Sequence, residues 1–153
     1  MNEPLINFRF AEIQIISKSL SQPPINGIKG NVSFDIKYEI KVQAENKIVI
    51  GFVTIGVREE EKKTEYLANF NLAYIFEIID FSNVIKLTQE NLYHVPQQLE
   101  DTIKQVGIST SRGVVFSELR GTYLHNYIMP VIDIQAFNTS NSKKEETNKS
   151  TNT

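Results

Sequence analysis

The sequence contains no cysteine and no tryptophan among its 153 residues. Without cysteine the chain has no disulfide, no thiolate nucleophile and no sulfur ligand for a metal. This composition fits a protein of the reducing cytoplasm, where disulfides are rare. What the chain does have is aromatic surface, with nine phenylalanines and six tyrosines.

The chain also has no large excess of positive or negative charge, because 16 basic and 18 acidic residues leave a net charge of -2. No broad positive field is present to attract nucleic acid or an anionic membrane. No apolar run is long enough to cross a bilayer. The segment Met1 to Phe10 has an early acid and a proline where a signal peptide has a basic start and an apolar core. We therefore expect a cytoplasmic protein that binds no nucleic acid and does not insert into membranes.

Residues for catalysis or metal binding are scarce. His94 and His125 each lack a second ligand at a recognised spacing. The segment from Gly27 to Gly30 is too short for a phosphate loop, and no nucleophile elbow occurs. These absences predict a protein that is not an enzyme and needs no cofactor.

Three charged residues leave alternatives open. Glu77 and Asp80 lie in or after an apolar strand, where burial would raise the pKa of a catalytic acid. The alternative for Glu77 is the wet face of that strand, shared with Asn69 and Asn71 of the same parity. Arg112 follows three hydroxyl residues, where it either binds an anion or completes the dipole of a helix end.

Alternation is clearest over residues 31–45, which predicts a strand with one dry and one wet face. The dry positions are Val32, Phe34, Ile36, Tyr38, Ile40 and Val42. Three further strands are expected over 5–20, 47–59 and 65–80. The apolar parity of the first slips between Phe10 and Ile13, which predicts a bulge. Strands with one solvated face are typical of antiparallel sheets.

Helical spacing replaces alternation after residue 90. Pro96 can open a helix, and Leu99, Ile103 and Val106 follow at helical spacing, continued by Thr110. Gly113 is the expected stop. A shorter apolar stretch, 123–137, is broken by Pro130 and predicts a short second helix. The polar segment 138–153 cannot bury a core and is expected to be disordered. The prediction is an α+β fold in a single domain, 1–137: a four-stranded antiparallel sheet with one long and one short helix.

Three stretches, in this order, resemble the SecB export chaperones. The segment from Phe8 to Ile13 resembles that family's first strand, Phe-x-Ile-x-x-Ile. Ser111-Arg112-Gly113 resembles its Ser-Arg-Gly signature at the end of the long helix. Pro130-Val131 through Phe137 resembles its Pro-Val-x-x-x-x-x-Phe segment. With the order of strands and helices, the resemblance covers about residues 5 to 137.

The resemblance implies an ATP-independent holdase that binds unfolded or precursor polypeptides for export. It implies a homotetramer, a dimer of dimers, with the long helix (Leu99, Ile103, Val106 and Thr110) at the interface. The apolar client groove would be formed by Phe10, Ile13, Ile15, Leu20, Ile25, Ile132 and Phe137. For each of these residues, ordinary core packing is the alternative interpretation.

The sequence departs from the family at the acidic positions that dock the SecA motor. The aligned residues here are Ser17, Ser21 and Asn69, none of them charged. SecA is then not a partner, or it docks on other acids such as Glu12, Glu77 or Asp80. Some SecB-like relatives guard a toxin–antitoxin system, and that specialised role is an alternative to export. A further alternative is a structural protein that uses its apolar face only to oligomerise.

Overall fold

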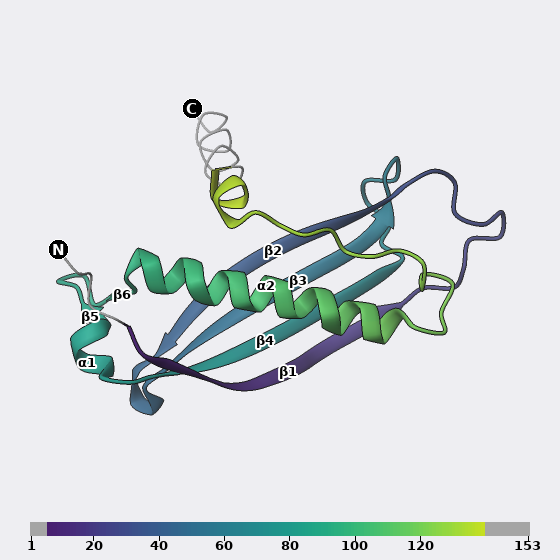
Figure 1. Cartoon of the computed structure of the whole chain (residues 1–153). Helices are drawn as coiled ribbons and strands as arrows, with labels where there is room; N and C mark the ends of the chain where they lie inside the picture. Colours follow the sequence, from purple (N-terminus) through teal and green to yellow (C-terminus); the bar gives the residue numbers. More distant parts are fainter. Residues whose placement is uncertain (1–5, 140–153) are drawn as a thin grey trace.

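A computed structural model describes residues 6–139 of the chain, and it contains one large antiparallel sheet (Figure 1). The strands are β1 Phe8–Leu20, β2 Val32–Gln43, β3 Ile48–Glu59 and β4 Ala68–Ile78. Their order across the sheet is β1-β4-β3-β2, so β1 and β2 form the edges. The predicted α+β class and all four predicted strands are confirmed. The tight turn between β2 and β3 is a short 3-10 helix, η1 Ala44–Asn46, closed by Lys47 with a φ of 56°.

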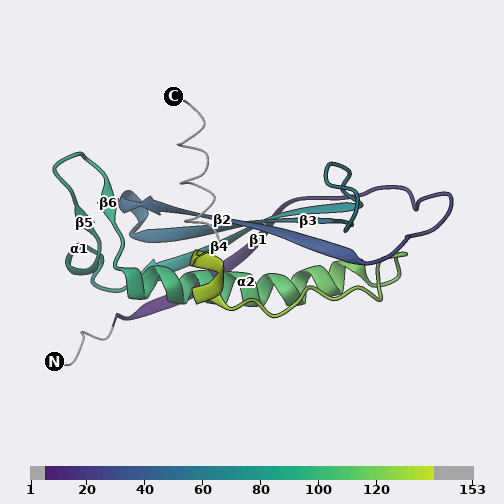
Figure 2. The ribbon, with the colours of Figure 1, turned by 90° about the horizontal axis from the view of Figure 1, so that it is seen from above.

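The connection from β4 to the long helix contains elements that the sequence did not predict. They are the one-turn helix α1 Phe81–Val84 and a small hairpin of β5 Lys86–Leu87 and β6 Tyr93–His94. The hairpin stands at one end of the sheet in Figure 2. Strands of two residues are too short to show alternation of apolar and polar residues, so the sequence pattern could not predict them.

The long helix α2 Gln97–Leu119 begins directly after Pro96, as expected, but does not end at Gly113. Within the two turns that follow that glycine, Val115 and Leu119 are buried against the sheet. Their burial, at about 1.5–3 kcal/mol for a large apolar side chain, outweighs the penalty of about 1 kcal/mol for a glycine within a helix. The Ser-Arg-Gly segment therefore lies inside the helix rather than at its end.

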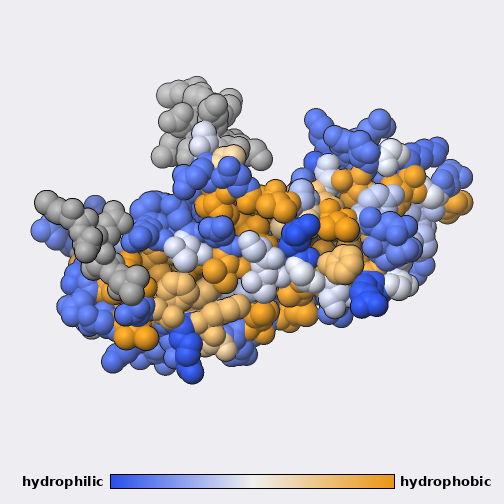
Figure 3. Space-filling model, in the orientation of Figure 1, coloured by the Kyte–Doolittle hydropathy of each residue, from blue (hydrophilic) through white to orange (hydrophobic). Residues whose placement is uncertain are grey.

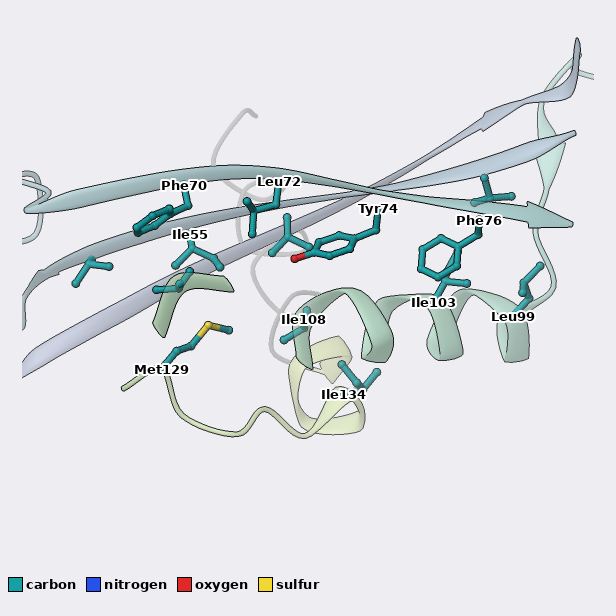
Figure 4. Close-up of a cluster of buried hydrophobic side chains, with 14 of the residues drawn as sticks. Ile55, Phe70, Leu72, Tyr74, Phe76, Leu99, Ile103, Ile108, Met129 and Ile134 are labelled. Carbon is teal, nitrogen blue, oxygen red and sulfur yellow. The ribbon is translucent and has the colours of Figure 1, made fainter. Parts of the chain in front are cut away.

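The core fills the space between α2 and one face of the sheet (Figures 2 and 4). The even-numbered residues of β4, among them Leu72, Tyr74 and Phe76, point toward the helix, which packs on β3 and β4. Leu99 and Ile103 meet them from α2. Gly107 faces the sheet, where a Cβ would make ordinary contacts, the nearest at 3.4 Å from the Tyr74 ring. We call this face of the sheet the inner face.

The outer face of the sheet is mostly polar toward β1 and β4. Glu77 lies here and forms an ion pair with Arg9 of β1, with N–O distances of 2.6 and 2.9 Å. Asn71 accepts a hydrogen bond from Thr54 and donates one to Ser17. The wet-face interpretation of Glu77 is confirmed. None of the helices described over 6–139 is long and apolar enough to cross a membrane.

After α2 the chain turns back along the helix as a strap (residues 120–133) that leads to a short helix at 134–139. Arg112 Nε donates a hydrogen bond to the Met129 carbonyl, at 2.7 Å. Neither sequence-based role for Arg112 is seen: the residue lies two turns before the helix end, and it anchors the strap. Asn138 accepts a hydrogen bond from Lys104, at 2.7 Å, and donates one to Asp101.

The short helix confirms the expected second helix but corrects its boundary. Residues 138 and 139 are helical, although the sequence placed them in a disordered tail. Asn138 stays ordered because its amide satisfies the buried Lys104. The rest of the predicted tail, 140–153, lies outside the described residues.

Candidate functional site

Apolar side chains are exposed along one face of β1. Phe10, Ile13, Ile15 and Leu20 have 38%, 42%, 42% and 46% of their surface exposed. Their β4 partners are Phe76, Tyr74, Leu72 and Ala68 on the inner face, so the four residues share that face. They remain uncovered because α2 packs on β3 and β4 and leaves the edge strand free. We call these four residues the β1 surface.

Two bulges interrupt the pairing of β1 with β4. One lies between Phe10 and Glu12, where the sequence predicted it, and the second lies between Ile15 and Ser17. Each bulge adds a residue, so the apolar parity changes twice along a single strand. Bulges also twist an edge strand and hinder uncontrolled pairing with other chains. The strand can therefore keep an apolar face and an open edge.

One flank of α2 borders the β1 surface. Val106, Thr110, Val114 and Glu118 follow at intervals of four, which places them along one row of the helix. Glu118 forms an ion pair with Lys18 of β1, so the row lies on the β1 side. The other three residues are partly exposed. Figure 3 views this side of the molecule, where apolar side chains reach the surface in several places.

Two pockets continue the β1 surface toward the end of the strand. The first has a volume of about 260 Å³ and lies between Leu20, Phe70 and Leu119, beneath the Lys18–Glu118 pair. The second, of about 660 Å³, lies between the crossover loop (residues 21–31) and the turn after β3. Its apolar lining comes from Pro24, Ile25 and Leu67. Volumes of 300 to 1,000 Å³ are typical of ligand sites in general.

A buried carboxylate lies at the wall of the larger pocket. Glu59, the last residue of β3, has only 3% of its surface exposed. It accepts a hydrogen bond from the backbone N–H of Lys29 in the crossover loop and pairs with Lys62 Nζ, both at 3.1 Å. These contacts hold the pKa of Glu59 below its usual value, chiefly through Lys62 and then through the Lys29 amide.

The predicted groove residues divide into two groups. Phe10, Ile13, Ile15 and Leu20 form the β1 surface, and Ile25 follows in the crossover loop with its side chain fully exposed. Ile132 and Phe137 belong to the strap and the short helix, on the opposite side of α2 (Figure 1). Both are partly buried against the core. They therefore do not join the surface formed by the other five.

The predicted interface residues of the long helix also divide. Leu99 and Ile103 have 1% and 0% of their surface exposed, because they pack on the chain's own sheet. They have no surface left for a second chain, which corrects the expectation for these two residues. Val106 and Thr110 lie on the partly exposed flank beside the β1 surface.

Other apolar residues are exposed that the sequence pattern did not single out. Ile16 occupies the second bulge, Phe116 lies on the outward side of α2, and Leu87, Leu92 and Tyr93 lie on or beside the small hairpin. The one available signal was the interruption of the alternation between Ile15 and Ile16, where two apolar residues stand side by side.

The histidines and acids that the sequence singled out are not brought together. His125 Nδ1 contacts the Thr122 carbonyl, and His94 lies on β6. Both carboxylate oxygens of Asp80 accept hydrogen bonds from Asn83. Over residues 6–139 no group of three histidine, aspartate or glutamate side chains is arranged to hold a metal ion.

No protein-family model and no curated protein matches this sequence. Among solved structures, the fold is similar to that of the Rv1957 SecB-like chaperone of Mycobacterium tuberculosis, solved with a ChAD peptide from the Rv1956 HigA1 antitoxin. The similarity has a TM-score of 0.54 at 13% sequence identity, and covers 82% of this chain and 90% of that one. The chain therefore has the SecB-like fold that the three sequence stretches indicated.

Proposed function

We propose that this chain is an ATP-independent holdase chaperone that binds unfolded polypeptide segments along the β1 surface. The observation that carries the proposal is the exposure of Phe10, Ile13, Ile15 and Leu20 on one face of an edge strand. An apolar face beside an open strand edge can bind extended chains through side-chain pockets and backbone pairing, with little demand on sequence. The SecB-like fold supports the same function, although a fold alone does not establish one.

Client segments would enter along β1 and reach the two pockets at its end. Leu20 borders the first pocket and Ile25 the second, so apolar contacts continue for the whole length of the strand. We place no client on Ile132 or Phe137, which lie across α2. Nothing in this mode of binding uses a nucleotide, a metal or a catalytic group.

Self-association is a second part of the proposal. We infer a homotetramer, assembled as a dimer of dimers in the cytoplasm, with Val106 and Thr110 on the flank of α2 as its contacts. A purely structural oligomer is the competing function, because a second copy could cover the β1 surface completely. The two differ in a measurable way, since a closed oligomer would ignore unfolded chains.

Export of precursor proteins and protection of an antitoxin are the two roles open to such a holdase. The aligned positions Ser17, Ser21 and Asn69 carry no charge; Ser17 accepts a hydrogen bond from Asn71, and Ser21 contacts the Tyr123 hydroxyl. SecA docking would then have to use other acids, such as Glu12, Glu77 or Asp80. This neutrality favours the specialised role, with an antitoxin segment as client, over general export.

The test is suppression of aggregation of a slowly folding, chemically unfolded client, diluted without nucleotide. We expect suppression at near-stoichiometric amounts, weakened by Ile13→Asp and by Ile15→Asp. The matched control is Gln14→Asp, which adds the same charge between them but on the outer face, where Gln14 pairs with Ala73. Absence of suppression by a folded sample, or equal loss in all three variants, would overturn the proposal.

A further inference from the structure

Glu59 is an unusual residue to find in the core of this chain. Among the residues described over 6–139, only Glu59, Lys104 and Ser111 are buried polar or charged side chains. Ser111 joins the helix to the sheet and Lys104 holds the short C-terminal helix. A buried charge is unfavourable unless it is paired and hydrogen-bonded. Glu59 meets that condition through two groups that lie outside the sheet, Lys29 and Lys62.

The crossover loop is tied to the sheet at few points. Its ends are fixed by backbone hydrogen bonds, from Ser21 N–H to the Leu67 carbonyl and from Glu60 N–H to the Asn31 carbonyl. Between them, Gly27 donates to Pro24 within the loop itself. The bond from the Lys29 amide to Glu59 joins the second half of the loop to the sheet, beside Ile28, which packs partly buried against the core. Ile25, near the tip, has no cover at all.

We propose that Glu59 is a positioning residue that holds the crossover loop over the 660 Å³ pocket and so keeps the pocket shaped for a client segment. This inference rests on the proposed holdase function and names the residue that controls one end of its binding surface. Lys62, which lies in the turn after β3, forms an ion pair with the same carboxylate and so helps to hold it in place. Without the pair, the loop keeps its two fixed ends and the packing of Ile28, but it loses the hydrogen bond that holds Lys29 at the wall of the pocket.

The Lys29 amide reports the contact directly, because its own hydrogen is the one that Glu59 accepts. We would measure its hydrogen-exchange protection by NMR in Glu59→Ala, Glu59→Gln and Lys62→Met. Glu59→Ala is expected to lower Lys29 protection at least tenfold. Glu59→Gln keeps an acceptor but loses the charge and should give an intermediate loss. The amides of Ser21 and Glu60, at the fixed ends, should keep their protection.

Lys63→Met is the matched control, since it removes the same charge one residue away from Lys62. It should leave Lys29 protection unchanged. Unchanged protection in Glu59→Ala, or equal loss at Ser21 and Glu60, would overturn the positioning role, the second because it indicates general unfolding.

Binding of an unfolded client is measured on the same samples. We expect several-fold weaker binding in Glu59→Ala and Lys62→Met, and wild-type binding in Lys63→Met. Loss of Lys29 protection with wild-type affinity would overturn the link between the loop and the client. Failure of the holdase function itself looks different, because wild-type protein would then bind no client while the Lys29 amide still responds to Glu59.

Discussion

The hydroxyl of Tyr74 donates a hydrogen bond to Ser111 Oγ, at 2.6 Å, in the buried interface between β4 and α2. The direction follows from Ser111, whose own hydroxyl hydrogen is given to the Gly107 carbonyl. Burial raises the pKa of Tyr74, so the phenol stays protonated and can donate. Ser111 therefore links the helix to the sheet, and it also accepts the hydrogen bond of a Tyr74 hydroxyl that is buried away from solvent.

The two partners should differ in mutational cost. Ser111→Ala leaves the Tyr74 hydroxyl buried without its acceptor, and we expect a loss of about 1–3 kcal/mol in the free energy of unfolding. Tyr74→Phe leaves Ser111 bonded to Gly107 and should cost about 0.5–1.5 kcal/mol. Urea denaturation measures both, and the double variant should be scarcely less stable than Tyr74→Phe. Equal costs for the two single variants would contradict this direction of donation.

Gly113 offers a test of self-association. A Cβ added there meets nothing within 4 Å, and the residue is in the middle of an exposed helix face. Gly113→Ala should therefore stabilise the chain by about 0.5–1 kcal/mol, the usual difference between glycine and alanine in a helix. If a second copy packs closely at this point, the same variant should weaken assembly in sedimentation velocity. Reduced stability of the monomer would contradict the expectation.

Gly51 and Gly56 lie on the same strand and should respond differently to alanine. A Cβ at Gly51 would lie 2.6 Å from the Tyr38 hydroxyl, which is buried beside α2. At Gly56 it would meet the ring of Tyr66, but that side chain is exposed and can turn away. Overpacking in a core costs about 1–3 kcal/mol, and we expect that loss for Gly51→Ala and less for Gly56→Ala. Thermal unfolding of the two variants, side by side, measures the difference, and a larger loss for Gly56→Ala would contradict it.

The strands β2 and β4 were predictable because each keeps its apolar residues on alternate positions of one parity. In β2 the alternation runs unbroken from Val32 to Val42, and the observed strand spans Val32–Gln43. The end of α2 was not predictable, because a local rule places a stop at Gly113 whereas burial of Val115 and Leu119 on the sheet decides otherwise. Tertiary burial outweighed local propensity at that point.

Only the part of the site that lies on a single strand could be predicted from the sequence. Phe10, Ile13 and Ile15 share the inner face despite a bulge, which the parity slip announced. The position of Ile132 depends on the path of the strap, and that path is fixed by Arg112 and Met129, which are distant in sequence. Glu59 gave no signal, because its burial comes from the crossover loop folding back on it.

The contact between Glu59 and the crossover loop should depend on pH. Lys62 first, and then the Lys29 amide, hold the pKa of Glu59 below its ordinary value of 4.5. A carboxylate with a lowered native pKa stabilises the fold fully above its unfolded pKa, and that contribution is lost as the pH falls through the native pKa. The charged groups around it are Lys29, Lys62, Glu61 and Glu65, all of which line the same pocket.

We therefore expect the exchange protection of the Lys29 amide, corrected for intrinsic exchange, to be constant above pH 4.5 and to fall below it. Glu59→Gln should have lower protection that no longer changes over this range, because the amide does not titrate. Ser21 serves as the internal control, since its amide bonds to a backbone carbonyl that cannot take up a proton. A parallel fall at Ser21 would indicate acid unfolding of the whole sheet. An unchanged pH profile in Glu59→Gln would show that Glu59 is not the group responsible.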